Sequence, residues 1–513
     1  MANGFGAALR RLARGRLTLA DLWLFLPPLA LVIVLNLYLV RPYDFWWQLR
    51  TGQIIVTTGA IPDTDLFTFT RFGQPWTNQG WLVQAAYYLL FRAGGLPLII
   101  FGHALTVTAG YALVEAACLR SNGGHVRAAV GATLTAAAMS IFNWNIRPQT
   151  ASFLFFGAVV FVLETHRARG GRIIWTLPVL FALWVNMHGG FVFGLGLVGI
   201  YVIARAAEEW LRERRLGSAA RRLLAAGVGS AVALLLNPAG PLGLVRYVVG
   251  FFQNAATQSN VEFGPLSLRT ADGQILFAAI VLFLLIAYAR RATVPPYLLA
   301  AGLAFGAFSF YSVRVEPWFG MAAAPAFALL LTPGAGVEAS AGGAPARPPE
   351  GSIPVARQDR PLLNYAVLGL VALCVAASLP WFRPGLPIPQ DRRSYTFENE
   401  TPVAAAQVVC QLGSQARIFN DIGYGSYLSW ACPQMPLFMD PRFELYPAEM
   451  WREYLQIGAG RYDWETMLAK YGVNVIFVNK RFEPALAAAA KTSRAWRVLY
   501  EDPQAIVLQR VTQ

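Results

Sequence analysis

Long apolar runs separated by short polar segments fill most of residues 1–381. Most of these runs are roughly 16 to 24 residues long, the length a helix needs to cross a bilayer. The pattern predicts about eleven transmembrane helices. They lie near 20–40, 96–119, 126–142, 149–165, 173–187, 190–206, 223–237, 274–290, 296–312, 318–333 and 363–380.

The pattern divides the chain into four parts. Residues 1–333 predict a transmembrane domain whose large first outer loop covers 41–95. Residues 334–361 are rich in Gly, Ala and Pro and predict a flexible cytoplasmic linker. Residues 362–381 predict the last transmembrane helix, and residues 382–513 an extracytoplasmic α/β domain.

In the last part, short β-rich runs alternate with helical ones, which predicts a largely parallel sheet. The predicted strands are ARIFN, PLFMD, VNVIFVN and AIVLQR. The predicted helices are ETPVAAAQVVCQL, PAEMWREYLQI, WETMLAKY and EPALAAAAKTS.

Charge refines this topology. The net charge is +14, but residues 1–381 hold 28 Arg, no Lys and 15 acidic residues. The excess lies in short loops between spans, as the positive-inside rule predicts for cytoplasmic loops, and this argues against nucleic-acid binding. With eleven spans, the N-terminus lies inside and the C-terminal domain outside. The stretch GWLVQAAYYLLFRAGG must then be an interfacial or re-entrant helix, because a full crossing would invert every later loop.

The first outer loop holds candidate catalytic acids. Its segment RPYDFWWQLRTGQIIVTTGAIPDTDLFTFT carries Asp44, Asp63 and Asp65. Asp44 stands beside two tryptophans, which favour the membrane–water interface. A partly desolvated carboxylate there suits a general base that meets a lipid-borne substrate. A helix cap, or a pair with Arg41 or Arg50, is the simpler alternative.

Cations follow in the other predicted outer loops. The arginine fork suits phosphate, so several cations near the outer surface would suit a phosphate on a lipid carrier. The candidates are Arg147, His188, Arg246, Arg269 and Arg314. Two simpler roles stay open, since Arg314 could pair with Glu316 and His188 could be a hydrogen-bonding residue at a helix end.

Cysteine spacing and motif searches exclude several chemistries. No CxxC, HExxH, Walker-type or dinucleotide motif is present, so a zinc site and ATP-driven chemistry have no support. Cys410 and Cys432 share the predicted outer domain, where a disulfide is an open alternative.

Several stretches together resemble the GT-C glycosyltransferase superfamily, which includes the protein O-mannosyltransferases and aminoarabinose transferases. A closer resemblance is to a poorly characterised bacterial group with "DxWWHLxTGxxIxxxGxIPxTDxFSxT", "PWxNxEWL" and "GYLxW…FxDxRxELY" motifs. Here they are DFWWQLRTGQIIVTTGAIPDTDLFTFT, PWTNQGWL and GSYLSW…LFMDPRFELY. The resemblance implies inverting transfer from a polyprenyl-phosphate-linked sugar at the outer leaflet, with Asp44 as the candidate base.

The candidate substrate-binding residues rest on their position and chemistry and not on a match to the group's motifs. Arg147 or His188 would hold the lipid phosphate. Arg50, Asn78, Gln79 and Arg314 complete the candidate binding set. Two departures stand out, because Gln48 replaces the group's His and Gly80 replaces the acid before WL.

The missing acid leaves room for a substitute. Asp63 or Asp65 would then supply the second carboxylate. For Asp440, Arg442 and Glu444 of the last motif, the resemblance implies a domain that covers the site and binds the acceptor. An internal salt-bridge network that holds a strand-to-helix turn is the simpler alternative.

These features predict a glycosyltransferase of the bacterial cytoplasmic membrane. Its partners would be a polyprenyl-phosphate sugar, the bilayer, and a glycan, lipid or protein acceptor. No metal ligand set is identified, although Mg²⁺ or Mn²⁺ could bind if the three loop aspartates converged. A flippase of lipid-linked glycans and a non-catalytic assembly protein are the alternatives. A flippase would favour ionisable residues inside the spans, and few are present.

Overall fold

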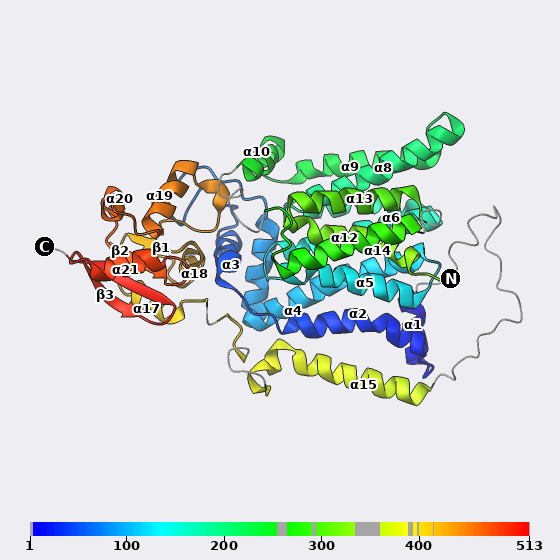
Figure 1. The fold of residues 1–513 in the computed structure, drawn as a ribbon, viewed down its shortest axis with the longest axis horizontal. Coiled ribbons are helices and arrows are strands. Elements are labelled where there is room, and N and C mark those ends of the chain that lie inside the picture. The colour runs from blue at the N-terminus through cyan, green and yellow to red at the C-terminus, as the bar shows by residue number, and fades with distance from the viewer. Residues whose placement is uncertain are drawn as a thin grey trace, which may run out of the picture.

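The chain folds into a long bundle of helices with a smaller α/β region at one end (Figure 1). This computed structural model describes residues 4–253, 264–289, 294–333, 360–387, 393–397, 400–413 and 415–511. The predicted linker 334–361 lies almost wholly outside the described residues. We call the end of the bundle that carries the α/β region the α/β end, and the opposite end the N-terminal end.

The bundle confirms the predicted polytopic membrane protein. Each of the eleven predicted spans falls on helix. Seven helices are long and apolar enough to cross a membrane by length and composition, and the others are shorter. The bundle helices are α1 (Gly4–Ala13), α2 (Leu19–Asn36), α4 (Trp81–Ser121), α5 (Val126–Ser140), α6 (Gln149–Arg169), α7 (Leu177–Trp184), α8 (Phe191–Glu213), α9 (Ser218–Ala233), α12 (Ala271–Ala289), α13 (Pro296–Tyr311), α14 (Glu316–Leu330) and α15 (Pro361–Ser378).

Small residues bring the central helices close together. A Cβ on Gly110 of α4 would lie 2.4 Å from the carbonyl oxygen of Phe153 on α6. A Cβ on Gly157 of α6 would lie 2.3 Å from the carbonyl oxygen of Gly110. Only glycine permits this approach, which is the usual way that membrane helices gain packing contacts without a hydrophobic driving force.

Two helical segments run across the α/β end instead of along the bundle. They are α3 (Pro42–Thr58) and the first part of α4 (Figure 1). The α4 helix bends at Gly94 and Gly95, where φ of Gly95 is 64° and Pro97 follows. The bend agrees with the expectation that GWLVQAAYYLLFRAGG does not cross the membrane. The first part of α4 and helix α3 therefore lie between the bundle and the α/β region (Figure 1).

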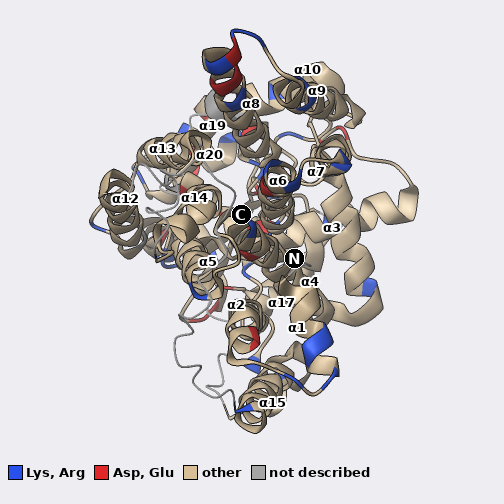
Figure 2. Cartoon of the chain, turned by 90° about the vertical axis from the view of Figure 1, so that its right-hand side faces the viewer, with Lys and Arg blue, Asp and Glu red and all other residues tan. Residues whose placement is uncertain are grey.

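At the N-terminal end, basic residues lie on turns and helix ends (Figure 2). Several are paired with acids on the same helix, such as Arg167 with Glu164 (3.1 Å) and Arg205 with Glu209 (2.9 Å). Arg11 of α1 pairs at 2.5 Å with Asp21, which forms a capping box with the N-cap residue of α2, Thr18. The charge asymmetry of the sequence is therefore located at this end of the bundle.

The α/β region contains a four-stranded mixed sheet in the order β1-β2-β4-β3. Its strands are β1 (Ile418–Asn420), β2 (Val475–Asn479), β3 (Trp496–Glu501) and β4 (Ala505–Arg510). Only β1 and β2 pair in parallel, and β4 pairs antiparallel with both β2 and β3. The prediction of a largely parallel sheet is wrong, because β3 and β4 form a hairpin and β3 was not recognised. PLFMD is not a strand either, since Leu437 makes only isolated bridges.

Helices cover this sheet, and one of them packs against α3. They are α17 (Val403–Cys410), α18 (Ile422–Ala431), α19 (Ala448–Gly458), α20 (Trp464–Lys470) and α21 (Pro484–Thr492). Cys410 and Cys432 form a disulfide with their Cα atoms 5.4 Å apart, which settles the alternative left open by the sequence. Helix α18 packs on α3, where the backbone N–H of Trp47 donates to Ser426 Oγ (3.2 Å).

A buried ion network joins the first loop to the α/β region. Arg442 Nη2 donates to Asp440 Oδ2 (2.5 Å) and to Asp65 Oδ1, and all three side chains are fully buried. The rings of Phe67 and Trp76 each lie 4.7 Å from the guanidinium carbon. The two carboxylates raise the pKa of Arg442 despite its burial. This network is the alternative that the sequence analysis gave for Asp440 and Arg442.

Replacing Arg442 should destabilise the protein strongly. Arg442→Ala leaves two buried carboxylates uncompensated, so the free energy of unfolding should fall by about 3–5 kcal/mol. Thermal unfolding followed by tryptophan fluorescence would measure this.

Arg417→Ala is the matched control, because Arg417 is an exposed arginine of the same region that lies over Phe69. Equal melting temperatures for the two variants would show that the network does not hold the regions together.

Candidate functional site

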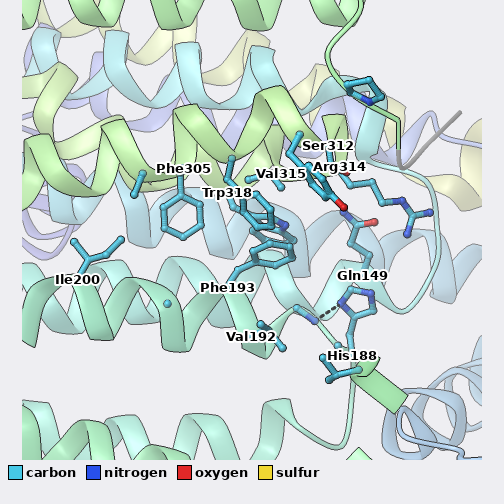
Figure 3. Close-up of a pocket in the computed structure, with 18 of the residues that line it drawn as sticks. Gln149, His188, Val192, Phe193, Ile200, Phe305, Ser312, Arg314, Val315 and Trp318 are labelled. Carbon is cyan, nitrogen blue, oxygen red and sulfur yellow. Dashed lines mark hydrogen bonds between the residues drawn. The ribbon is translucent and has the colours of Figure 1, made fainter. Parts of the chain in front are cut away.

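A cavity of about 670 Å³ opens in the bundle near the α/β end. Helices α8 and α13 form its sides, together with α10 (Gly240–Gln253) and the start of α14. One arm is apolar and is lined by Phe193, Ile200, Phe305, Phe308 and Trp318 (Figure 3). The other end is polar and is lined by Gln149, His188, Tyr247, Ser312 and Arg314. The cavity thus combines an apolar channel with a polar end that carries the guanidinium group of Arg314. We call this polar end the mouth of the cavity.

His188 is held at the polar end by the turn between α7 and α8. Its Nδ1 accepts the backbone N–H of Gly190 (3.0 Å) and lies 2.8 Å from Ser152 Oγ. Ser152 in turn accepts the indole N–H of Trp184 (2.8 Å). Because the Gly190 N–H can only donate, the neutral ring carries its proton on Nε2. His188 can therefore donate one hydrogen bond from Nε2.

The surroundings keep this ring neutral. Burial and the nearby guanidinium groups of Arg314 and Arg147 lower the pKa of His188 to about 3. Arg314 comes from the 3₁₀ turn η5 (Val313–Val315), which directly precedes α14. The same electrostatic influence indicates that both arginines lie close to the ring.

Asp44 joins this group through Arg147. Its Oδ2 lies 3.7 Å from Arg147 Nη1, and about a third of the Asp44 side chain is exposed. Asp44 is in the first turn of α3, where Pro42 starts the helix and the helix dipole favours a carboxylate. The structure therefore brings Asp44, Arg147, His188 and Arg314 to one place.

The other two loop aspartates lie elsewhere. Asp65 is fully buried and accepts the backbone N–H groups of Phe67 and Thr68 (both 3.1 Å) besides its pair with Arg442. Asp63 has an exposed side chain, and its carbonyl oxygen accepts the N–H of Trp76 (2.7 Å). The three aspartates of the first loop do not converge.

Gln79 holds the turn that carries His188, and Asn78 holds the start of α4. The Asn78 amide exchanges hydrogen bonds with Gln84 (2.8 Å each way), and Gln84 donates to Gln48 Oε1 (2.7 Å). Gln79 donates to the carbonyl oxygen of Val185. Gln48, the departure from the group's His, is thus one member of a buried amide chain.

Asn237 gives a further anchor to the turn that carries His188, whereas Arg50 bonds within α3. Asn237 donates to the carbonyl oxygens of Gln79 (3.1 Å) and Val185 (3.0 Å). Arg50, on the outer part of α3, donates to Gln53 (2.6 Å). Asn78, Gln79 and Arg50 thus each donate a hydrogen bond to another group of the protein.

Gly80 allows the first loop to pack closely against the 185–188 turn. A Cβ at position 80 would lie 2.9 Å from the carbonyl oxygen of Met187. An acidic side chain at this position, as in the group's motif, would push the 185–188 turn away. The departure at Gly80 is thus matched by a close contact between two loops.

The described residues do not fit a divalent cation. Within this part of the chain, no three His, Cys, Asp or Glu side chains come together in a metal-binding group. Asp44 and Asp65 each face an arginine, which repels a cation.

Some residues of the site were not found from the sequence. Tyr247 and Gln149 line the polar end, and Ser152 orients His188. Helix α10 was predicted as part of a loop, although GPLGLVRYVVGFFQ has apolar residues on one helical face. That amphipathic pattern was the available signal for Tyr247.

Solved structures show what the chain is similar to. An oligosaccharyltransferase from Archaeoglobus fulgidus matches 95% of this chain and 74% of its own, with 13% identity and a TM-score of 0.54. ArnT from Cupriavidus metallidurans, bound to undecaprenyl phosphate, matches 99% of this chain and 98% of its own, with 16% identity and a TM-score of 0.50. Arabinofuranosyltransferase AftD from Mycobacteria matches 95% of this chain but 41% of its own, with 15% identity and a TM-score of 0.53.

This is the fold of the GT-C membrane glycosyltransferases. No family description and no curated protein matches the sequence, so the GT-C similarity is structural. The similarity extends across both the bundle and the α/β region, because it covers nearly the whole chain. At these identities it establishes the GT-C fold and leaves substrate and chemistry to the residues of the site.

Gly80→Ala should be destabilising in this GT-C fold. The added methyl group meets a backbone carbonyl that cannot rotate away, so the free energy of unfolding should fall by about 1–3 kcal/mol. The matched control is Gly199→Ala on α8, where an added Cβ has nothing within 4 Å. Thermal unfolding of both variants tests the contact, and a neutral Gly80→Ala would show that the 185–188 turn is not packed as described.

His188 should make stability fall as pH decreases. Its pKa is about 3 in the folded protein and about 6.5 unfolded, so the unfolded chain takes up the proton first. Between pH 7 and pH 5 this should remove roughly 1–2 kcal/mol of the free energy of unfolding. In His188→Gln this component should vanish, while a pH profile identical to wild type would contradict a buried neutral ring.

Proposed function

We propose that this chain transfers a sugar from a polyprenyl-phosphate donor to an acceptor at the α/β end of the bundle. The observation that carries the proposal is the cavity, which joins an aromatic channel to a cationic mouth. A polyprenyl chain fits the channel by burial of apolar surface. Its phosphate suits Arg314, Arg147 and the Nε2–H of His188, which offer charged and neutral donors.

The GT-C fold also supports sugar transfer from a polyprenyl-phosphate donor. ArnT, which has this fold, binds undecaprenyl phosphate. The arginine-rich N-terminal end would face the cytoplasm by the positive-inside rule, so the α/β end would face outward. We infer a location in the bacterial cytoplasmic membrane and a glycan, lipid or protein as acceptor.

Asp44 is the proposed general base. Its carboxylate is partly exposed and lies 3.7 Å from Arg147, which in turn lies near His188 at the polar end of the cavity. It would take the proton of an acceptor hydroxyl as the acceptor oxygen bonds to the anomeric carbon. The bond from that carbon to the phosphate oxygen breaks, and its electron pair leaves with the lipid phosphate.

The cations would act on the leaving group. Negative charge grows on the lipid phosphate as the sugar departs, and fixed guanidinium groups stabilise it without reorganisation. Attack opposite the leaving group gives inversion at the anomeric carbon. For Asp65 we propose a structural role instead, since its carboxylate is already neutralised by Arg442.

The decisive comparison is wild type against Asp44→Asn. Loss of the base should lower transfer by about 10²–10⁴-fold, while binding of undecaprenyl phosphate is retained. Purified protein in nanodiscs, tested with a panel of polyprenyl-phosphate sugars, gives the rate, and native mass spectrometry gives lipid binding.

Asp63→Asn is the matched control, because it neutralises an exposed carboxylate of the same loop. Unchanged transfer in Asp44→Asn would reject Asp44 as the base. Wild-type protein that binds the lipid but transfers no sugar would favour a flippase or a non-catalytic assembly protein.

A further inference from the structure

A second pocket lies at the N-terminal end of the bundle, away from the cavity. Its volume is about 220 Å³, and its walls come from the end of α6, the second half of α8 and the starts of α9 and α13. Helix α6 runs from Gln149 at the mouth of the cavity to His166 in this pocket, a rise of roughly 25 Å. Figure 2 looks onto this end of the bundle. The two pockets are therefore separate.

Basic side chains dominate the polar lining of this second pocket. Three arginines and a histidine face a single acid among the lining residues. These five residues are His166, Arg167, Arg205, Glu208 and Arg222. Leucines from α6 and α9 and tyrosines from α8 and α13 supply most of the remaining side chains. A basic wall beside apolar side chains suits an anionic group.

Two of these arginines are held by acids of the protein. Arg167 Nε lies 3.1 Å from Glu164, and Arg205 Nε lies 2.9 Å from Glu209. Glu164 is fully buried and also accepts the hydroxyl of Tyr201 (3.0 Å). These pairs shape the walls, and their charges are largely compensated within the bundle.

Arg222 of α9 differs from the other two arginines. Its Nε donates to the carbonyl oxygen of Ser218 (3.2 Å), and it forms no salt bridge with any described residue. The acid of the pocket, Glu208, is already engaged by Arg205 (3.0 Å) and Arg212 (3.1 Å). The terminal nitrogens of the Arg222 guanidinium group can therefore donate to a bound anion.

Tyr297 of α13 brings an unsatisfied hydroxyl to the same pocket. Its ring packs on that of Tyr201, with the centroids 4.8 Å apart, and the guanidinium carbon of Arg167 lies 5.8 Å from it. The hydroxyl oxygen is buried and has no hydrogen-bond partner within the described part of the chain. A buried hydroxyl without a partner is unfavourable, so a ligand oxygen that accepts from it is favoured.

We propose that the second pocket binds a phosphate ester, whose oxygens accept hydrogen bonds from the Arg222 guanidinium group and the Tyr297 hydroxyl. A phosphate offers several oxygens to donors on different helices, and the arginine fork matches two of them. The volume, about a third of that of the cavity, suits a head group and not a whole lipid. The ester is either the head group of a lipid in the adjacent leaflet or a soluble molecule.

This proposal goes beyond sugar transfer and does not depend on it, because the carrier lipid would occupy the other pocket. A ligand here would touch α6, α8, α9 and α13 at once. Because it would bind the folded chain and not the unfolded one, it should also raise the melting temperature.

The competing explanation is that anions gather at this end only because it is rich in arginine. Arg221→Gln separates the two explanations, since Arg221 is the exposed neighbour of Arg222 on α9 and does not line the pocket. Both substitutions remove one positive charge from the same turn of the same helix. Only Arg222→Gln removes a donor of the pocket.

The experiment measures binding of two probes to the purified full chain in detergent. Native mass spectrometry follows phosphatidylglycerol, and isothermal titration calorimetry follows glycerol 3-phosphate. Arg222→Gln should weaken binding about 10- to 100-fold, the usual effect of losing hydrogen bonds to a charged group. Tyr297→Phe should weaken it about 3- to 10-fold, because a neutral hydrogen bond is lost.

Two further variants locate the site. Arg221→Gln should bind both probes within about twofold of wild type, and so should Arg314→Gln at the mouth of the cavity, because neither residue lines the second pocket. Loss of binding in Arg314→Gln but not in Arg222→Gln would place the phosphate in the cavity and overturn the proposal.

The two probes identify the source of the phosphate. A loss in Arg222→Gln that is seen only with phosphatidylglycerol supports a lipid head group, and a loss seen with glycerol 3-phosphate supports a soluble ester. The proposal is overturned if wild-type protein binds neither probe, or if Arg221→Gln loses as much binding as Arg222→Gln. None of these results depends on sugar transfer, so this proposal and the proposed function can fail separately.

Discussion

A single guanidinium group ties together the parts of the molecule that build the site. Arg442 of the α/β region is fully buried between Asp440, its near neighbour in sequence, and Asp65 of the first loop. Aromatic rings from the same loop and from α3 surround it, with Trp47 and Trp76 among them. A buried charge is tolerated only when it is paired and hydrogen-bonded, so these segments cannot separate without exposing an uncompensated ion. The arrangement of the α/β region over the bundle depends on this constraint.

The ion network around Arg442 also determines the geometry of the site. Helix α3 carries Trp47 toward Arg442 and Asp44 toward Arg147, so one helix links the ion network to the cavity mouth. The turn that bears His188 is fixed from the other side by Gln79 and Asn237. Rigid supports of this kind matter because cations aimed at a phosphate act without reorganisation only when they are held in place. The first-loop acids then divide by environment, since Asp65 is buried against Arg442 and Asp44 is partly exposed beside Arg147.

Much of this could be expected from the sequence. Hydrophobic run length determines helices in a membrane protein because the bilayer imposes one minimum length, and each predicted span falls on helix. The candidates Asp44, Arg147, His188 and Arg314 were chosen for their residue type and predicted loop position. His188 and Arg314 line the cavity, and Arg147 lies between His188 and Asp44. The α/β region was harder to predict, because short strands carry little periodicity. Strand β3 and helix α18 were missed, and the sheet is mixed instead of largely parallel.

The sequence by itself determined the membrane bundle, the charge asymmetry between its ends and the residue types available to the site. These are local properties, since they depend on run length, composition and the loop on which a residue falls. Only the tertiary structure determined the exposure and the partners of each acid. Asp63 and Asp65 are two residues apart, yet one is exposed and the other lies against an arginine 377 positions away. No local pattern in the sequence encodes a pairing between residues so far apart in the chain.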